Sequence, residues 1–302
     1  MKNSLIFCLL LLSSSSAFSQ EIAPQTVYFE TLPTPNGVQP SGDPSIPQIG
    51  WYRWTTKNFS IHSIDKTQGE YLFGNIEQMK SWCLTRWGLP DADFTAEARI
   101  FCATSTEEMK KLFNIDSSFA EVREEGGKIK ISYLWLVNDV RPAEIVPPAL
   151  TVICMKEFEK KNSQNIGWYA HRGMAVLNET LPQIRRNLGG LDAVLQKDSE
   201  IFFSKSLFQM TEADWKKQTP QMRQLYDNEA AVMCLLIRKE FGQKNFQSFL
   251  RAGPNVSSDW VLGFKTNGEL DATFKRYMFY LVQDIKQNKT PDTYLQIVPV
   301  TK

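Results

Sequence analysis

The sequence predicts an α+β fold, with a small mixed sheet near the N-terminus followed by a helical half. Two observations carry this prediction. Short segments in which apolar residues alternate with polar ones occur between residues 58 and 137, whereas from residue 147 to residue 285 the apolar residues recur at helical spacing. Strands grouped ahead of helices are typical of α+β proteins.

Residues 1–19 have the features of a secretory signal peptide. Lys2 supplies a positive charge, the eight-residue apolar run from Leu5 to Leu12 is too short to cross a bilayer, and Ala17-Phe-Ser19 offers small residues before a cleavage site at Gln20. No later segment reaches the ~18 consecutive apolar residues that a membrane helix needs. We therefore expect a secreted or periplasmic protein without a transmembrane anchor.

The next segment, residues 20–56, is predicted to be a Pro-rich arm. It holds six prolines between Pro24 and Pro47 and has no core of its own, and the aromatic residues from Trp51 to Trp54 are expected to attach it to the rest of the chain. A single domain is then predicted over residues 57–290, followed by a C-terminal tail over residues 291–302.

Three strands and two helices are predicted in the first part of this domain. Period-two patterns indicate a strand beginning at Phe59 and strands over residues 98–103 and 128–137. Apolar residues at helical spacing predict a helix over residues 71–87. Residues 106–113 are predicted to form a short helix with a Thr cap and acidic residues in its first turn.

The second part of the domain is predicted to be helical. Pro147 and Pro148 suit the first turn of a helix that runs to about Lys161, and the next helix is expected to begin near Trp168 and to pack against it. Further helices are predicted over residues 192–197, 204–210, 220–241, 246–250 and 270–285.

Charge and cysteine content exclude several classes of function. Without Lys2 the chain has 33 basic and 33 acidic residues, which gives no support for nucleic acid or an anionic membrane as a partner. The four cysteines beyond the signal peptide are too widely spaced for a zinc knuckle or a C-x-x-C redox motif. An oxidising compartment permits disulfides, but each cysteine lies in an apolar run, so we favour buried thiols. These residues are Cys83, Cys102, Cys154 and Cys234.

The most informative segment is Gly167-Trp-Tyr-Ala-His-Arg-Gly-Met-Ala-Val-Leu-Asn-Glu179. Together with Phe59-Ser-Ile-His-Ser63, Trp87-Gly-Leu-Pro90 and Tyr226-Asp-Asn-Glu-Ala230, in this order, it resembles secreted gluzincin-type metallopeptidases of the peptidase MA-like group. The resemblance covers residues 57–285 and implies a thermolysin-like catalytic-domain fold.

Gluzincins bind zinc through H-E-x-x-H on one helix and a Glu on the next helix. This chain has two histidines and no H-E-x-x-H, and Arg172 stands where the family places the Glu. The motif can be aligned with Lys156–Lys160, which retains Glu157, or with Leu150–Cys154, which we favour because it keeps the usual spacing. A lysine ammonium has no lone pair, and Leu and Thr are not zinc ligands. The resemblance therefore implies a scaffold without zinc or another cofactor.

The degenerate cleft is expected to contain five residues, namely Glu157, His171, Arg172, Tyr226 and Glu229. A buried unpaired guanidinium is costly, so Arg172 is predicted to point into the cleft and pair with Glu157 or Glu229. A metal set of His171 with Cys154 or Glu157 is a less favoured alternative. Tyr226 is expected to be a core residue with a satisfied hydroxyl.

These observations favour a non-catalytic binding or scaffolding protein whose partner is a protein or peptide. Two alternatives stay open. A hydrolase with a rearranged metal site or metal-free chemistry would need carboxylates with shifted pKa values in the cleft. A structural protein of the cell envelope predicts no open cleft.

Overall fold

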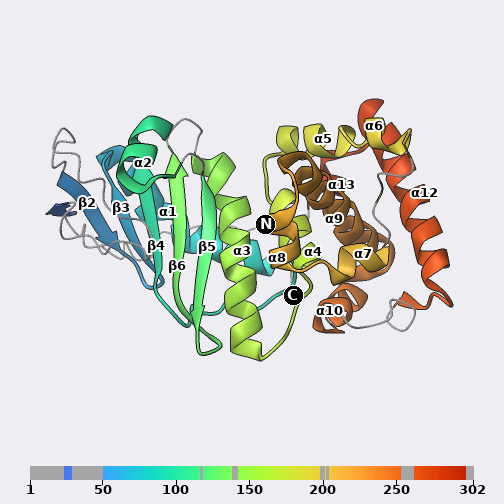
Figure 1. Cartoon of the computed structure of the whole chain (residues 1–302), viewed down its shortest axis with the longest axis horizontal. Coiled ribbons are helices and arrows are strands. Elements are labelled where there is room, and N and C mark those ends of the chain that lie inside the picture. The colour runs from blue at the N-terminus through green and yellow to red at the C-terminus, as the bar shows by residue number, and fades with distance from the viewer. Residues whose placement is uncertain are drawn as a thin grey trace, which may run out of the picture.

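The computed structural model describes residues 24–28, 50–115, 118–137, 142–197, 201, 204–252 and 262–296. The predicted signal peptide lies outside these residues. The described chain forms a mixed sheet followed by a helical half, with helix α3 (Pro142–Asn162) between them (Figure 1). The predicted α+β class is therefore confirmed.

The sheet has six strands in the order β1-β2-β3-β4-β6-β5. Strands β3, β4 and β6 run parallel to one another, whereas β1, β2 and β5 pair in antiparallel fashion. The predicted strands are confirmed as β3, β4 and β6. In chain order the strands are β1 (Gln25–Tyr28), β2 (Gly50–Thr55), β3 (Phe59–Ser63), β4 (Ala98–Ala103), β5 (Phe119–Glu125) and β6 (Lys128–Val137).

Strands β1, β2 and β5 were not predicted. The first two lie within the residues predicted to be an arm, and Trp51 and Trp54 of β2 are buried in the core, so the sheet begins before residue 57. Strand β5 lies at the end of the sheet and carries Glu121, Arg123 and further charged residues. Charged side chains are typical of edge strands, and they hid the apolar alternation that marks a strand.

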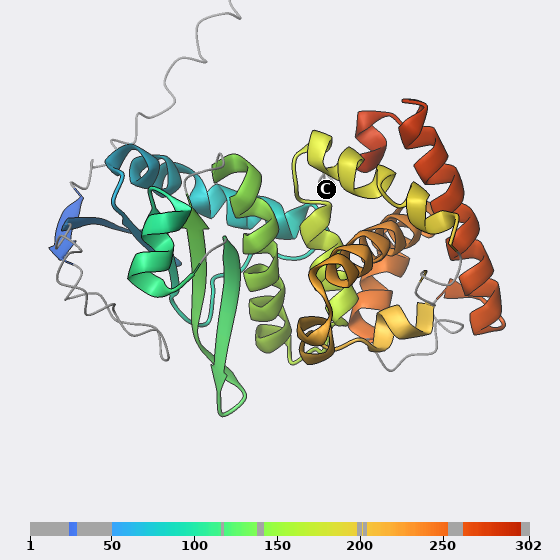
Figure 2. The same cartoon turned by 45° about the horizontal axis from the view of Figure 1, so that its top comes forward.

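Different helices cover the two faces of the sheet. Helices α1 (Lys66–Thr85) and α3 pack on the face that carries Ile61, Ile100 and Leu134. Helix α2 (Thr106–Phe113) lies on the opposite face, over an aromatic cluster in which the Phe101 and Trp135 rings stack with centroids 4.9 Å apart (Figure 2).

Three predicted helix starts need correction. Helix α1 begins at Lys66 rather than Tyr71, because the Asp65 carboxylate caps its first turn. The cap of α2 is Ser105, whose hydroxyl accepts from the Glu108 N–H at 3.1 Å, and not Thr106. Helix α3 begins at Pro142, so Pro147 and Pro148 lie inside it rather than in its first turn, where proline is best tolerated.

The helical half surrounds the buried helix α9, and Gly173 lets α4 approach it closely. A Cβ at Gly173 would lie 2.5 Å from the Ala230 carbonyl oxygen and 2.8 Å from the Cys234 sulfur. As predicted, α3 packs against α4. The helices are α4 (Trp168–Val176), α5 (Leu181–Gly189), α6 (Asp192–Leu195), α7 (Ser204–Gln209), α8 (Glu212–Lys217), α9 (Pro220–Glu240), α10 (Gly242–Ala252), α12 (Asn267–Lys286) and α13 (Asp292–Leu295). Helices α5, α8 and α13 were not predicted, and α13 lies in the residues predicted to be a C-terminal tail.

No helix among the described residues has both the length and the apolar character needed to cross a bilayer.

Candidate functional site

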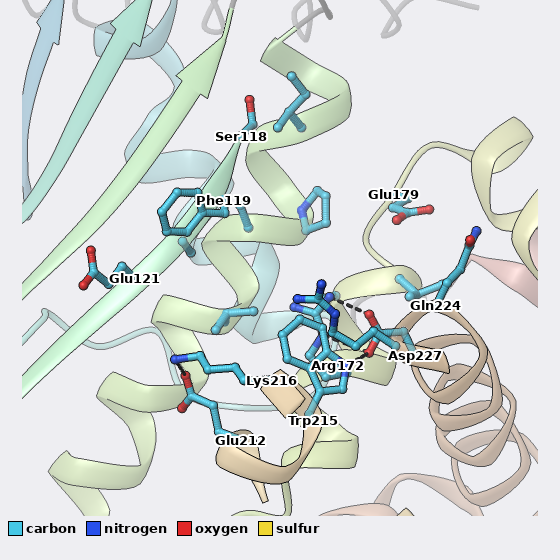
Figure 3. A pocket seen from close by; sticks show the side chains of 18 of the residues that line it. Ser118, Phe119, Glu121, Arg172, Glu179, Glu212, Trp215, Lys216, Gln224 and Asp227 are labelled. Atoms are coloured by element: carbon cyan, nitrogen blue, oxygen red, sulfur yellow. Dashed lines mark hydrogen bonds and ion pairs between the residues drawn. The ribbon is translucent and has the colours of Figure 1, made fainter. Parts of the chain in front are cut away.

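A pocket of about 1340 Å³ lies where the β5 edge of the sheet meets the helical half (Figure 3). Strand β5 and helices α3, α4, α5, α8 and α9 contribute to its walls. The pocket therefore combines residues from both halves of the chain.

An ion pair between Arg172 on α4 and Asp227 on α9 lies in the wall of this pocket. The guanidinium donates from Nε to Oδ1 at 3.0 Å and from Nη2 to Oδ2 at 2.6 Å. Trp215 on α8 donates its indole N–H to Oδ1 at 2.9 Å, and its ring lies 4.4 Å from the guanidinium carbon. The Arg172 and Asp227 side chains are 23% and 11% exposed. Both carboxylate oxygens of Asp227 are thus engaged.

The predicted partners of Arg172 were wrong. Glu157 instead accepts hydrogen bonds from the backbone N–H and the hydroxyl of Thr95, at 2.7 and 2.6 Å. Glu229 is fully buried on α9. Residues two apart on a helix project about 200° from one another, so Asp227 faces the pocket while Glu229 faces the interior.

Helix α3 contributes a stripe of pocket-lining residues that differs from both alignments of the zinc motif. Leu150 and Cys154 are buried in the core, and Lys160 pairs with Glu124 outside the pocket lining. The lining residues of α3 are Ile145, Pro148, Ala149, Val152 and Lys156. The apolar pairs spaced four residues apart are therefore Ile145 with Ala149 and Pro148 with Val152, and none of these side chains can bind a metal.

His171 belongs to a buried network behind the pocket. Its Nε2 lies 3.3 Å from Oε1 of Glu159, and its ring stacks on Trp168 with centroids 5.2 Å apart. Burial alone would raise the pKa of Glu159, but His171 and Lys156 hold that pKa below its usual value. His171 is fully buried and does not line the pocket.

Tyr226 is also a core residue. It is fully buried, and its hydroxyl donates to the Leu207 carbonyl at 3.1 Å. Burial raises the pKa of this phenol well above its usual value, so it stays protonated. Of the five residues expected in the cleft, only Arg172 lines the pocket.

Glu179 is a pocket residue that was not among the five residues expected in the cleft. It follows α4 at the end of the Gly167–Glu179 segment, and its carboxylate accepts from the Asn187 amide at 2.5 Å. Burial raises its pKa to about 7, with Arg172 opposing and Asp227 supporting the shift. Its place at the end of the most informative segment was the available signal. Asp227 lies likewise in the Tyr226–Ala230 segment, whereas Trp215 offered no signal, because only folding brings α8 to α4.

The other charges of the pocket are also mostly paired. Lys216 contacts Glu212 at 2.9 Å, and Arg123 contacts Glu121 at 2.8 Å. Arg223 lies over the Trp215 ring at 5.2 Å. The walls therefore present aromatic surfaces beside several ion pairs, and Arg186 and Arg223 add positive charge.

Within the described ranges, no group of three or more His, Cys, Asp or Glu side chains is arranged to hold a metal ion. The four cysteines are free and buried, as predicted. Burial raises the pKa of Cys83 to about 12, which leaves almost no thiolate at neutral pH.

Comparison of the sequence with models of protein families gave no match, and comparison with curated protein sequences gave none either. The function must therefore be argued from the pocket itself.

Proposed function

We propose that this chain is an exported, metallopeptidase-like protein without a zinc site, and that it binds a protein or peptide segment in the pocket beside β5. The observation that carries this proposal is the Arg172–Asp227 pair. Arg172 stands where the resemblance places the third zinc ligand, and its guanidinium is held in the pocket wall by a bidentate ion pair. A guanidinium has no lone pair for a metal, and its charge repels one.

The shape of the pocket favours an extended polypeptide as the ligand. Strand β5 pairs only with β6, so within the described sheet one row of its backbone N–H and C=O groups is unpaired. Such an edge can accept a further strand. A volume of about 1340 Å³ also exceeds the range of about 300–1,000 Å³ that is usual for small-molecule sites. Phe119 and Trp215 offer apolar surface for its side chains.

The presence of this pocket favours binding over a purely structural role, which predicts no open cleft. Export is proposed from the signal-peptide features of residues 1–19. N-terminal sequencing of the secreted protein is expected to begin at Gln20, and a mature chain that begins at Met1 would contradict export by this route.

Peptide selection tests the binding proposal. Peptides selected from a random library on the wild-type protein should lose at least about tenfold in affinity when Ala149→Trp fills the pocket from α3. The matched control is Ala272→Trp, which places the same side chain on the exposed surface of α12 and should leave affinity unchanged.

Two results would contradict the proposal. One is a selection in which no peptide distinguishes Ala149→Trp from Ala272→Trp, with both variants shown by circular dichroism to be folded. The other is cleavage of the selected peptide during prolonged incubation with the purified wild-type protein, followed by mass spectrometry.

A second candidate function, hydrolysis without a metal, is favoured by one observation. Glu179 has a pKa raised to about 7, while Asp227 is held by Arg172 and Trp215 in the same pocket. Two carboxyl groups in such different surroundings are typical of general acid–base sites. Turnover of a chromogenic glycoside or peptide that is abolished by Glu179→Gln would establish this function in place of simple binding.

A further inference from the structure

A second charged region lies on the sheet face opposite α1 and α3. Arg53 on β2, Ser60 and His62 on β3, and Arg99 on β4 all point to this face, because side chains alternate along a strand and Phe101 on the same side of β4 lies under α2. The region is separate from the pocket, since none of these residues lines it.

The two arginines lie on either side of strand β3. His62 is paired in register with Arg53, and Ser60 with Arg99. The Arg53 Nε donates to the Ser60 hydroxyl oxygen at 3.3 Å, and the His62 Nε2 lies 3.0 Å from the same oxygen. Ser60 is fully buried and His62 is 3% exposed. The polar groups of β3 therefore form a buried floor beneath two partly exposed guanidinium groups.

Among the described residues of this face, the carboxylates Glu97 and Glu121 pair with Arg99 and Arg123, which leaves Arg53 without a carboxylate partner. Arg53 has no ion-pair partner among these residues, and Arg99 pairs only with Glu97, whose side chain is 43% exposed. The buried Nδ1 of His62 also has no hydrogen-bond partner there. Burial, together with the positive charges of Arg53 and Arg99, lowers the pKa of His62 to about 3.

We infer that Arg53 and Arg99, with Ser60 and His62 beneath them, form a binding site for a phosphate group. A guanidinium fork donates to two oxygens of a phosphate, and arginines on the two strands that flank β3 can donate to different oxygens of one tetrahedral phosphate. A phosphate oxygen can also displace the exposed Glu97 carboxylate from Arg99, because exposed ion pairs contribute little. The phosphate can be inorganic phosphate or the phosphate ester of a lipid headgroup.

Titration with inorganic phosphate at constant ionic strength tests this inference, because the chain has only two histidines. In nitrogen-15 spectra of the imidazole rings, phosphate should shift the His62 signals in a saturable manner and leave the His171 signals in place. Calorimetry should give a Kd below about 1 mM, and Arg53→Gln or Arg99→Gln should weaken binding at least about tenfold. Arg276→Gln on α12 removes the same charge at an exposed position and should have no effect.

A second experiment, which measures binding to lipid vesicles, distinguishes a lipid headgroup from free phosphate as the ligand. Tighter binding to vesicles that contain phosphatidylglycerol than to inorganic phosphate, lost in Arg53→Gln, would assign a lipid headgroup. Equal or weaker binding to such vesicles would assign free phosphate. The inference is overturned if no saturable His62 shift occurs, or if Arg53→Gln and Arg276→Gln bind phosphate equally. It is independent of peptide binding in the pocket, so Ala149→Trp should bind phosphate as the wild type does.

Discussion

The pocket wall and the sheet face around His62 both contain arginines, but Arg172 and Arg53 differ in whether a carboxylate neutralises the guanidinium. Arg172 in the pocket makes a bidentate ion pair with Asp227 and stacks on Trp215. Arg53 on the sheet face contacts only the Ser60 hydroxyl among the groups that the structure describes. An arginine that is already paired leaves recognition to shape and backbone hydrogen bonds, whereas an arginine without a carboxylate partner can bind an anion.

The largest effect is expected from low pH, which should destabilise the fold through His62 on the sheet face. The pKa of His62 is lowered to about 3 by burial and by Arg53 and Arg99, whereas an unfolded histidine titrates near about 6.5. Between these pKa values the unfolded state therefore binds a proton on this histidine and the folded state does not. The free energy of unfolding falls as pH decreases from about 6.5 towards 3, by about 3–5 kcal/mol in total. Urea unfolding across this range should show a shallower pH dependence for His62→Gln than for the wild type, and equal slopes would contradict the assignment.

Widening the contact between α4 and α9 should break the pairing in the pocket. Gly173→Ala places a Cβ against the Ala230 carbonyl, so the helices must separate and Arg172 must move relative to Asp227. We expect a loss of about 3 kcal/mol in the free energy of unfolding. Gly74→Ala is the control, because its Cβ meets nothing within 4 Å on helix α1, and it should stabilise by up to about 1 kcal/mol. Comparable unfolding midpoints for the two variants would refute the close approach.

Removing the cation itself should have a somewhat smaller effect. Arg172→Ala leaves Asp227 with only the Trp215 N–H, and the pair is partly exposed, so the expected loss is about 2–3 kcal/mol. Lys216→Ala breaks the exposed pair with Glu212 and should cost less than about 1 kcal/mol. Chemical denaturation measures both, and similar losses would show that Arg172 is no more important than a surface charge.

The smallest effect is expected at Glu179. Its pKa is raised to about 7, above the unfolded value of about 4.3, so its contribution is present at low pH and is lost as pH rises through 7. At about pH 8, Glu179→Gln should stabilise the fold by about 1–2 kcal/mol after allowance for partial exposure, and at about pH 4, below the unfolded pKa, it should be neutral. A stabilisation that does not change between these pH values would show that ionisation of Glu179 is not its cause.

Local sequence patterns determined much of the architecture of this protein. Alternation and helical spacing identified β3, β4, β6, α2, α4, α9 and α12, because apolar residues recur along these elements at the spacing of a strand or a helix. Strand β5 escaped because an edge strand shows charge instead of alternation. Helix α5 begins with Leu181 and Pro182 and buries only Ile184 and Leu188, too few positions for a clear period.

The composition of the pocket was decided by tertiary structure. The sequence singled out Arg172 and the need for a carboxylate partner, since an unpaired buried cation is costly in any fold. The carboxylate that pairs with Arg172 is decided by the rotation of α9, which directs Asp227 to the pocket and Glu229 to the core. The placement of Arg53 and Arg99 on either side of β3 likewise depends on strand register. Register and helix rotation arise from contacts between residues far apart in the chain, and local patterns carry no record of them.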